Sequence, residues 1–371
     1  MNIESSFPFR VVSGFRPLRG LHVGHYAAVL SDLIRDQYVQ SRSTYVFVAD
    51  HHARSKWIEA ADFINIGRNT FKTARELLAL GLDPDYSVIY RQSDVPEIFE
   101  LMWFFAGLAS DGRLRENQAF KADNSPTAGT YLYPLLMVGD ILSLKASHVA
   151  IGRDQKQHLE LARDVAGKLI RQFGPRLVPV PEYLNPEPLL IHGIDSRETQ
   201  LRKMASENHN EIAIFDDEQT VKDRINRIAT VALPWGAALP PDGCNIVTYA
   251  GCIGGPVMEA QFRQKYATPG YGFKEAKRDL TELFFDTFSA ARQRIHKLDD
   301  HVVDSVLAMG ARHAREQIAG LLFELREAAR GGANRARQAS AERDCPDGTC
   351  HTILVESCPT TRSVARQRTL H

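Results

Sequence analysis

The chain has 371 residues, with 45 Lys and Arg against 45 Asp and Glu, 44% apolar residues and five cysteines. These fractions are typical of globular proteins, and no stretch approaches the roughly eighteen apolar residues of a membrane-spanning helix. The first ten residues also lack the apolar region of a secretory signal, so we expect a cytoplasmic protein that no disulfide framework holds together. A net charge of zero excludes a surface that is basic throughout, but not a local patch for nucleic acid.

Short β-branched runs alternate with helical patterns through the first 200 residues. The expected strands are Phe9–Ser13, Thr44–Ala49, Ser87–Tyr90 and His148–Gly152. Between them, helices are expected to open at Gly24, to run from about Ala60 to Leu80, and to start at Tyr133. This alternation predicts an α/β fold, with a Rossmann-like parallel sheet covered by helices on both faces.

The pattern becomes helical after about residue 220. One apolar stripe recurs at steps of three and four residues, formed by Val303, Val306, Leu307, Ala314, Ile318, Leu321, Leu322 and Leu325. From residue 331 to the end there are six arginines, four carboxylates and no aromatic residue, which favours a flexible tail. We therefore predict a sheet domain over 1–219, a helical domain over 220–330 and a tail over 331–371.

The segment from Ser13 to Tyr26 follows the first predicted strand and opens a helix, so its free N–H groups face whatever binds there. Gly24 lets a flat group approach the backbone, and His22 and His25 share one helix face. Two imidazoles aimed at one anion can stabilise charge that develops on a phosphate. An ordinary helix start with two exposed histidines is the alternative.

A second group lies on one face of the helix expected from Tyr133, where Tyr133, Met137 and Asp140 follow at steps of four and three. An apolar face with one phenol and one carboxylate suits an aromatic ligand whose single polar hydrogen needs an acceptor. Alternatively, Asp140 pairs with a basic neighbour. Downstream, the strand ending at Val149 and Ile151 runs into a glycine turn, which is where doubly wound sheets bind ligands.

Two further segments contain residues that could bind a metal or a phosphate, but neither segment alone indicates a site. Asp50-His51-His52 resembles a metal or phosphoesterase motif, but the Asp-x-Asp run that such a site needs upstream is missing. Arg202-Lys203-Met204-Ala205-Ser206-Glu207 lies in a polar stretch, where a mobile lysine can neutralise a polyphosphate. An ordinary charged loop is the alternative.

In this order, the segments resemble the class I aminoacyl-tRNA synthetases, and specifically the tryptophanyl-tRNA synthetases, over about residues 9–330. The matching segments are His22-Val23-Gly24-His25 for the His-Ile-Gly-His motif, Lys203 to Glu207 for the Lys-Met-Ser-Lys-Ser loop, Tyr133 to Leu142 for the tryptophan-pocket helix, Gly152 to Leu161 for the strand-to-helix turn, and Gln92 to Pro96 and Phe120-Lys121.

The resemblance implies a tryptophan–tRNA ligase, which activates L-tryptophan with ATP and Mg²⁺ and transfers it to tRNA(Trp), and which forms a homodimer. It implies catalytic roles for His22, His25, Lys121 and Lys203; nucleotide contacts for these histidines and Lys203 together with Gly14, Arg16, Gly24, Gly152, Asp154 and Met204; and tryptophan contacts for His52, Tyr133, Met137, Asp140, Val149, Ile151 and Gln155. No metal site built by the protein is expected, because the spacing of Cys345, Cys350, His351 and Cys358 matches no standard zinc arrangement.

The chain departs from the family pattern in both nucleotide-binding segments. Leu18 and Arg19 stand where the family has a small hydroxyl residue and a glycine, and Ser206 and Glu207 stand at the second lysine and the last serine of its loop. One cation is lost and one anion gained, so we hypothesise that Arg19 or Arg202 compensates. The same departures favour an alternative function, a paralogue that binds or adenylates tryptophan without charging tRNA.

Overall fold

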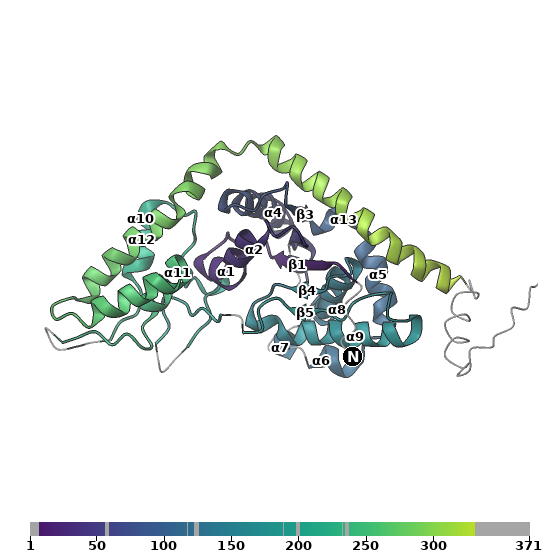
Figure 1. Cartoon of the computed structure of the whole chain (residues 1–371), viewed down its shortest axis with the longest axis horizontal. Coiled ribbons are helices and arrows are strands. Elements are labelled where there is room, and N and C mark those ends of the chain that lie inside the picture. Colours follow the sequence, from purple (N-terminus) through teal and green to yellow (C-terminus); the bar gives the residue numbers. More distant parts are fainter. Residues whose placement is uncertain are drawn as a thin grey trace, which may run out of the picture.

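The computed structural model describes residues 7–330, apart from 56–58, 117, 122–125, 188, 198–200, 232 and 234–236. The predicted tail and its three cysteines lie outside the described residues. Figure 1 shows a sheet unit on the right, a helical arm on the left, and two long helices that meet above them. No helix in the described part is long and apolar enough to cross a bilayer.

Five parallel strands form one sheet in the order β3-β2-β1-β4-β5, which confirms the predicted α/β class. Their bounds are β1 Phe9–Phe15, β2 Arg42–Val48, β3 Ser87–Arg91, β4 His148–Val149 and β5 Glu182–Tyr183. β4 is shorter than predicted, because after Ala150 donates its N–H to Val12 O (2.9 Å) the chain turns away at Gly152. β5 was not predicted, since two residues carry no periodicity.

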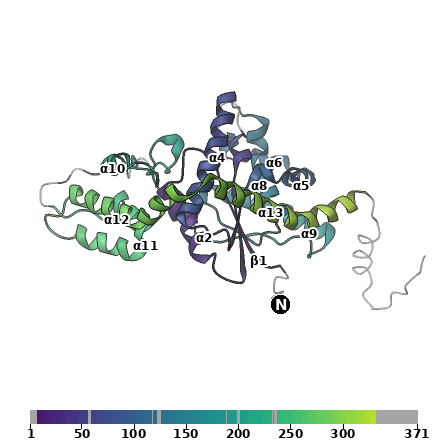
Figure 2. The same cartoon turned by 90° about the horizontal axis from the view of Figure 1, so that it is seen from above.

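Helices cover both faces of this sheet. The first 200 residues contain α1 Val23–His25, which continues through a π-helical turn at Tyr26–Leu30 into α2 Ser31–Asp36, and then α3 Asp50–Ala53, α4 Ala60–Leu80, α5 Glu97–Ala106, α6 Asp111–Arg115, α7 Gln118–Lys121, α8 Ala128–Ser143 and α9 Lys156–Phe173. The later helices are α10 Glu218–Asn226, α11 Asn245–Tyr266, α12 Phe273–Arg294 and α13 Asp300–Ala329. Figure 2 shows α10, α11 and α12 grouped on one side of the sheet unit.

Helix ends follow local capping chemistry. α4 has the predicted bounds, because Gly81 ends it in the left-handed conformation with φ 115°. α8 begins five residues before the predicted start at Tyr133. There, the Thr127 side chain accepts a hydrogen bond from the Thr130 N–H at 3.1 Å and caps the helix. Pro134 therefore lies inside the helix, not at its first turn.

Successive residues of β1, β2 and β3 point to opposite faces of the sheet and belong to two separate hydrophobic cores. Val11, Val46 and Ile89 belong to a core with α4, α11 and α12, whereas Val12 and Tyr45 belong to a core with α5, α8 and α9. The sheet thus separates two apolar layers, as expected for strands that are buried on both faces.

α13 joins these two cores across β3. The predicted stripe is buried, but Val303 to Leu307 pack in the first core and Ala311 to Leu325 in the second. The crossing point is Gly310, whose added Cβ would lie 1.9 Å from the Ile89 carbonyl oxygen. α13 therefore packs mainly on β3 and α5 of the sheet unit. The division near residue 220 stays a prediction.

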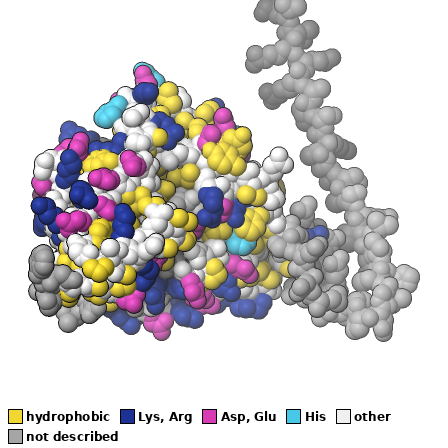
Figure 3. Space-filling view, turned by 60° about the vertical axis from the view of Figure 1, so that its left-hand side comes forward, with side chains coloured by type: hydrophobic (Ala, Val, Ile, Leu, Met, Phe, Trp, Pro, Cys, Tyr) yellow, Lys and Arg dark blue, Asp and Glu magenta, His cyan; other side chains and the backbone are white. Residues whose placement is uncertain are grey.

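Charges of both signs are mixed on the molecular face that Figure 3 shows, where Lys and Arg alternate with Asp and Glu. This agrees with the zero net charge of the sequence. Any nucleic-acid contact on this face must use a small group of cations.

Candidate functional site

A cavity of about 200 Å³ opens at the carboxyl ends of β1, β2 and β4. Ligands bind at this edge in doubly wound sheets. Its wall contains these predicted site residues: Gly14, Arg16, His22, Gly24, His25, His52, Tyr133, Met137, Asp140, Val149, Ile151, Gly152, Asp154, Gln155, Lys203 and Met204. Lys121 is the exception, because it is exposed at the end of α7 and does not line the cavity.

Two segments far apart in the sequence meet beside this cavity. The Val23 N–H donates to Ile212 O and the Ile214 N–H to Leu21 O, both at 3.0 Å. This antiparallel bridge joins the start of α1 to the residues that follow the Lys203 loop. It explains how the two predicted anion-binding segments come to line one cavity.

His22 and His25 form a stacked pair at the start of α1, with ring centroids 3.7 Å apart. Nδ1 of each ring accepts the backbone N–H of the other residue, at 3.3 and 3.4 Å. Burial lowers the pKa of His25 to about 4, helped by Lys203 and Arg16, and burial next to His25 holds the pKa of His22 well below its usual value. Both rings are therefore neutral near pH 7, and each carries its proton on Nε2, as a hydrogen-bond donor.

Asp140 lies at the bottom of the cavity and is 1% exposed. Its Oδ2 contacts His52 Nε2 at 2.8 Å, and Gln92 Nε2 donates to its Oδ1 at 2.7 Å. The basic neighbour that the sequence left open is thus His52. Each carboxylate oxygen accepts more than one hydrogen bond, so Asp140 keeps acceptor capacity for a ligand.

Aromatic and apolar side chains form the wall above Asp140. The Tyr133 ring lies 4.3 Å from the His52 ring and 5.4 Å from the His158 ring, and Met137 and Val149 are buried. Burial lowers the pKa of His158 to about 4, so this ring is neutral as well. An apolar wall that ends at one carboxylate suits a flat ligand with a single N–H.

The Asp50-His51-His52 segment does not form a metal site. Asp50 accepts the Ser93 N–H at 3.0 Å and pairs with Arg54 at 2.7 Å, while His52 contacts Asp140. Among the described residues, no group of three or more His, Cys, Asp or Glu could hold a metal ion.

Lys203 crosses the mouth of the cavity and pairs with Asp154, with Nζ and Oδ2 2.8 Å apart. Burial raises the pKa of Asp154, but the charge of Lys203 and the hydrogen bonds from Lys203 and Gln155 outweigh it, so the pKa falls below its usual value. Lys203 is thus held over the cavity by the turn that follows β4.

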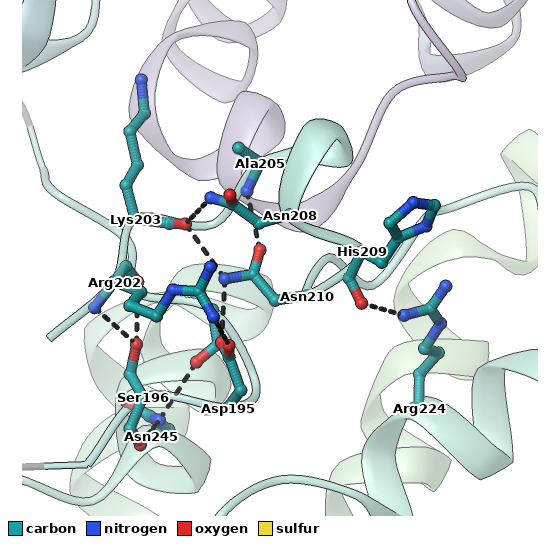
Figure 4. Close-up of polar contacts among 11 residues, drawn as sticks. Asp195, Ser196, Arg202, Lys203, Ala205, Asn208, His209, Asn210, Arg224 and Asn245 are labelled. Carbon is teal, nitrogen blue, oxygen red and sulfur yellow. Dashed lines mark hydrogen bonds and ion pairs between the residues drawn. The ribbon is translucent and has the colours of Figure 1, made fainter. Parts of the chain in front are cut away.

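A network of side chains orders the backbone of the Lys203 loop (Figure 4). Asn210 Oδ1 accepts the Ala205 N–H at 2.9 Å, and its Nδ2 donates to Asp195 Oδ1 at 2.8 Å. Asn245, the first residue of α11, donates to Ser196 O at 3.0 Å. Lys203 points away from this network, so the loop backbone is fixed while the ammonium group faces the cavity.

Three of the four departures from the family pattern can be placed, whereas the side chain of Glu207 lies outside the described part of the structure. Leu18 and Ser206 line the cavity. Arg19 Nη1 lies 2.7 Å from Nδ1 of His209, a non-glycine residue at φ 52°, and Arg202 pairs with Asp195 at 2.9 Å. Neither arginine lines the cavity.

Two polar side chains at or beside the cavity, Gln92 and Arg153, were given no role from the sequence. Gln92 donates a hydrogen bond to Asp140. Its position directly after β3 could have indicated a site residue, because ligands bind at the carboxyl ends of the strands in such sheets. Arg153 lines the cavity next to Asp154, and its place in the glycine turn after β4 is a comparable signal.

The comparisons with known proteins agree with this geometry. The family model of the class I tRNA synthetases for W and Y matches residues 4–232. The parallel sheet, the paired histidines at a helix start and the lysine loop over one cavity are the features that the resemblance to this class predicted.

Curated relatives narrow the class. A tryptophan–tRNA ligase of Pseudomonas syringae is 34% identical over 86% of this chain and 73% of its own length, and one of Caulobacter vibrioides is 32% identical over 86% and 95%. The tryptophanyl-tRNA synthetase of Campylobacter jejuni, solved with ADP and tryptophan, matches with a TM-score of 0.74 and 29% identity over 86% of this chain and 99% of its own. The chain belongs to the tryptophan–tRNA ligase family.

Proposed function

We propose that the cavity activates L-tryptophan with ATP, supplied as its magnesium complex, and then transfers the aminoacyl group to tRNA(Trp). The observation that supports this most is that one cavity combines an apolar wall ending at Asp140 with His22, His25 and Lys203 in its lining. The apolar wall with Asp140 suits the indole ring, and the two histidines with Lys203 suit the polyphosphate.

The roles of single residues follow from their places. Asp140 accepts the indole N–H, with its orientation held by His52 and Gln92. Tyr133 and Gln155 bind the polar end of the amino acid, and Met137, Val149 and Ile151 contact the ring. The neutral imidazoles donate Nε2–H groups to the phosphates, while Lys203 supplies positive charge.

Gly24 fits a nucleotide close to the backbone. A Cβ at this position would lie 3.0 Å from the His22 ring and 3.3 Å from Met204 Sδ, which would narrow the passage between the two segments. Gly14, Arg16, Gly152 and Asp154 complete this side. Lys121 has a catalytic role only if α7 moves toward the cavity, so we expect its substitution to matter less than that of Lys203.

Tryptophan-dependent exchange of labelled pyrophosphate into ATP tests the first step, and acid-stable charging of tRNA tests the second. Exchange that tyrosine supports better than tryptophan would contradict the role of Asp140. Ser206, neutral where the family has a lysine, favours a second candidate, an adenylating paralogue without tRNA charging. Exchange without charging would support that candidate.

A homodimer in the cytoplasm is part of this proposal. On α5, the Trp103 and Phe99 side chains are 78% and 40% exposed, which is unusual for large apolar residues on a free surface. Sedimentation at micromolar concentration should give twice the chain mass, and a monomer would contradict the paired form.

A further inference from the structure

The sequence offered Arg19 and Arg202 as the cations that could offset the lost loop lysine, but the structure places neither on the cavity wall. Arg19 is held by His209 and Arg202 by Asp195, and neither lines the cavity. Both guanidinium groups already have partners that hold them outside the cavity.

The described cavity wall contains three cations: Arg16, Arg153 and Lys203. Lys203 is partly neutralised by Asp154 at 2.8 Å, and Ser206 contributes no charge. Arg153 is exposed, and among the described residues no hydrogen-bond or ion-pair partner is found for it. Its guanidinium group is therefore available to a ligand.

The position of Arg153 also suits an anion. It opens the 3-10 turn Arg153–Gln155, one residue before the carboxylate that pairs with Lys203. This turn follows β4 at the carboxyl edge of the sheet, where its backbone is fixed by the Gln155 N–H, which donates to Gly152 O at 3.0 Å. Arg153 and Lys203 thus lie at the same part of the cavity mouth, on different segments.

We infer that Arg153 is the second pyrophosphate-binding cation of this chain, at the charge position that Ser206 leaves empty. The inference rests on the adenylation proposed above. There, a tryptophan carboxylate oxygen bonds to the α-phosphorus while the bond from that phosphorus to the bridging oxygen breaks, and the electron pair leaves with pyrophosphate. A planar guanidinium group binds two phosphate oxygens at once and offsets this charge beside Lys203.

Direct binding of magnesium pyrophosphate to the full-length chain, measured by calorimetry, tests the inference without requiring turnover. Arg153→Gln should weaken binding about 10- to 100-fold, the range for loss of a charge-assisted contact. Arg153→Lys should retain most of the affinity, and Ser206→Lys added to Arg153→Gln should restore it. Arg176→Gln, just beyond the far end of α9, is the matched control and should bind as the unaltered chain does.

Equilibrium dialysis with labelled tryptophan checks each variant, because the inference expects unchanged tryptophan affinity. Unchanged pyrophosphate binding in Arg153→Gln would overturn the inference, and so would a larger loss in Arg19→Gln. Absence of exchange activity in the unaltered chain would contradict the proposed function instead, and the binding comparison would still decide the role of Arg153.

Discussion

The crossing of α13 over β3 predicts opposite effects for two glycines of one helix. At Gly310, a Cβ would lie 1.9 Å from the Ile89 carbonyl oxygen and 2.6 Å from its carbon. At Gly320, a Cβ would meet nothing within 4 Å. Gly310→Ala should therefore destabilise the chain, whereas Gly320→Ala should stabilise it.

The magnitudes follow from the contacts. An ordinary separation of about 3.5 Å requires α13 or β3 to move on the order of 1.5 Å, and such overpacking costs about 1–3 kcal/mol. Removing a helical glycine at the open position gains roughly 0.5–1 kcal/mol. The two variants should thus differ by about 2–4 kcal/mol in free energy of unfolding.

Urea unfolding followed by circular dichroism measures this difference, with the unaltered chain as reference. The midpoint for Gly310→Ala should fall below that reference and the midpoint for Gly320→Ala should lie at or above it. Equal midpoints for the two variants would refute the close contact between α13 and Ile89.

Three further variants test ionisable groups, two of which, His25 and Asp140, lie in the cavity wall. Glu76 is 1% exposed, and burial raises its pKa to about 7, so its ionisation reduces the stability of the unaltered chain by up to about 3 kcal/mol as pH rises from 4.5 to 7. The stability of Glu76→Gln relative to the unaltered chain should therefore be higher at pH 8 than at pH 4.5, and a difference that does not change with pH would contradict this. The pKa of His25 lies near 4 in the folded chain, so its protonation favours unfolding as pH falls from 6.5 to 4, and His25→Asn should reduce this loss in urea titrations. Asp140→Asn presents an amide to the His52 and Gln92 donors and should weaken tryptophan binding in dialysis by about 10- to 100-fold, whereas Asp94→Asn should not.

The strands β1, β2 and β3 were predictable because each is at least five residues long and more than half of its residues are β-branched or aromatic. β5 was not, since Glu182 and Tyr183 carry no alternation. The apolar stripe of α13 was also visible in the sequence, but such a stripe does not indicate which element the helix packs against. Its packing on two cores depends on Gly310 meeting Ile89, a contact between residues far apart in the sequence.

The candidate site also has features that the sequence predicted and features that only the structure shows. Apart from Lys121, every site residue that the family resemblance assigned lines the cavity. The neutral state of His25 was not visible, because its pKa depends on burial and on Lys203, a residue distant in the chain. The partners of Arg19 and Arg202 could likewise not be predicted from the sequence, and only the fold shows that neither arginine lines the cavity.

The placement of α13 against β3 also bears on how the chain avoids aggregation through the edge of its sheet. β3 ends the sheet on one side, and an uncovered end strand offers unpaired backbone groups to strands of other molecules. The close approach of Gly310 to the Ile89 backbone leaves no room for such a strand. A chain that ended before Asp300 would keep the cavity residues but lose this cover, and we expect it to aggregate through β3.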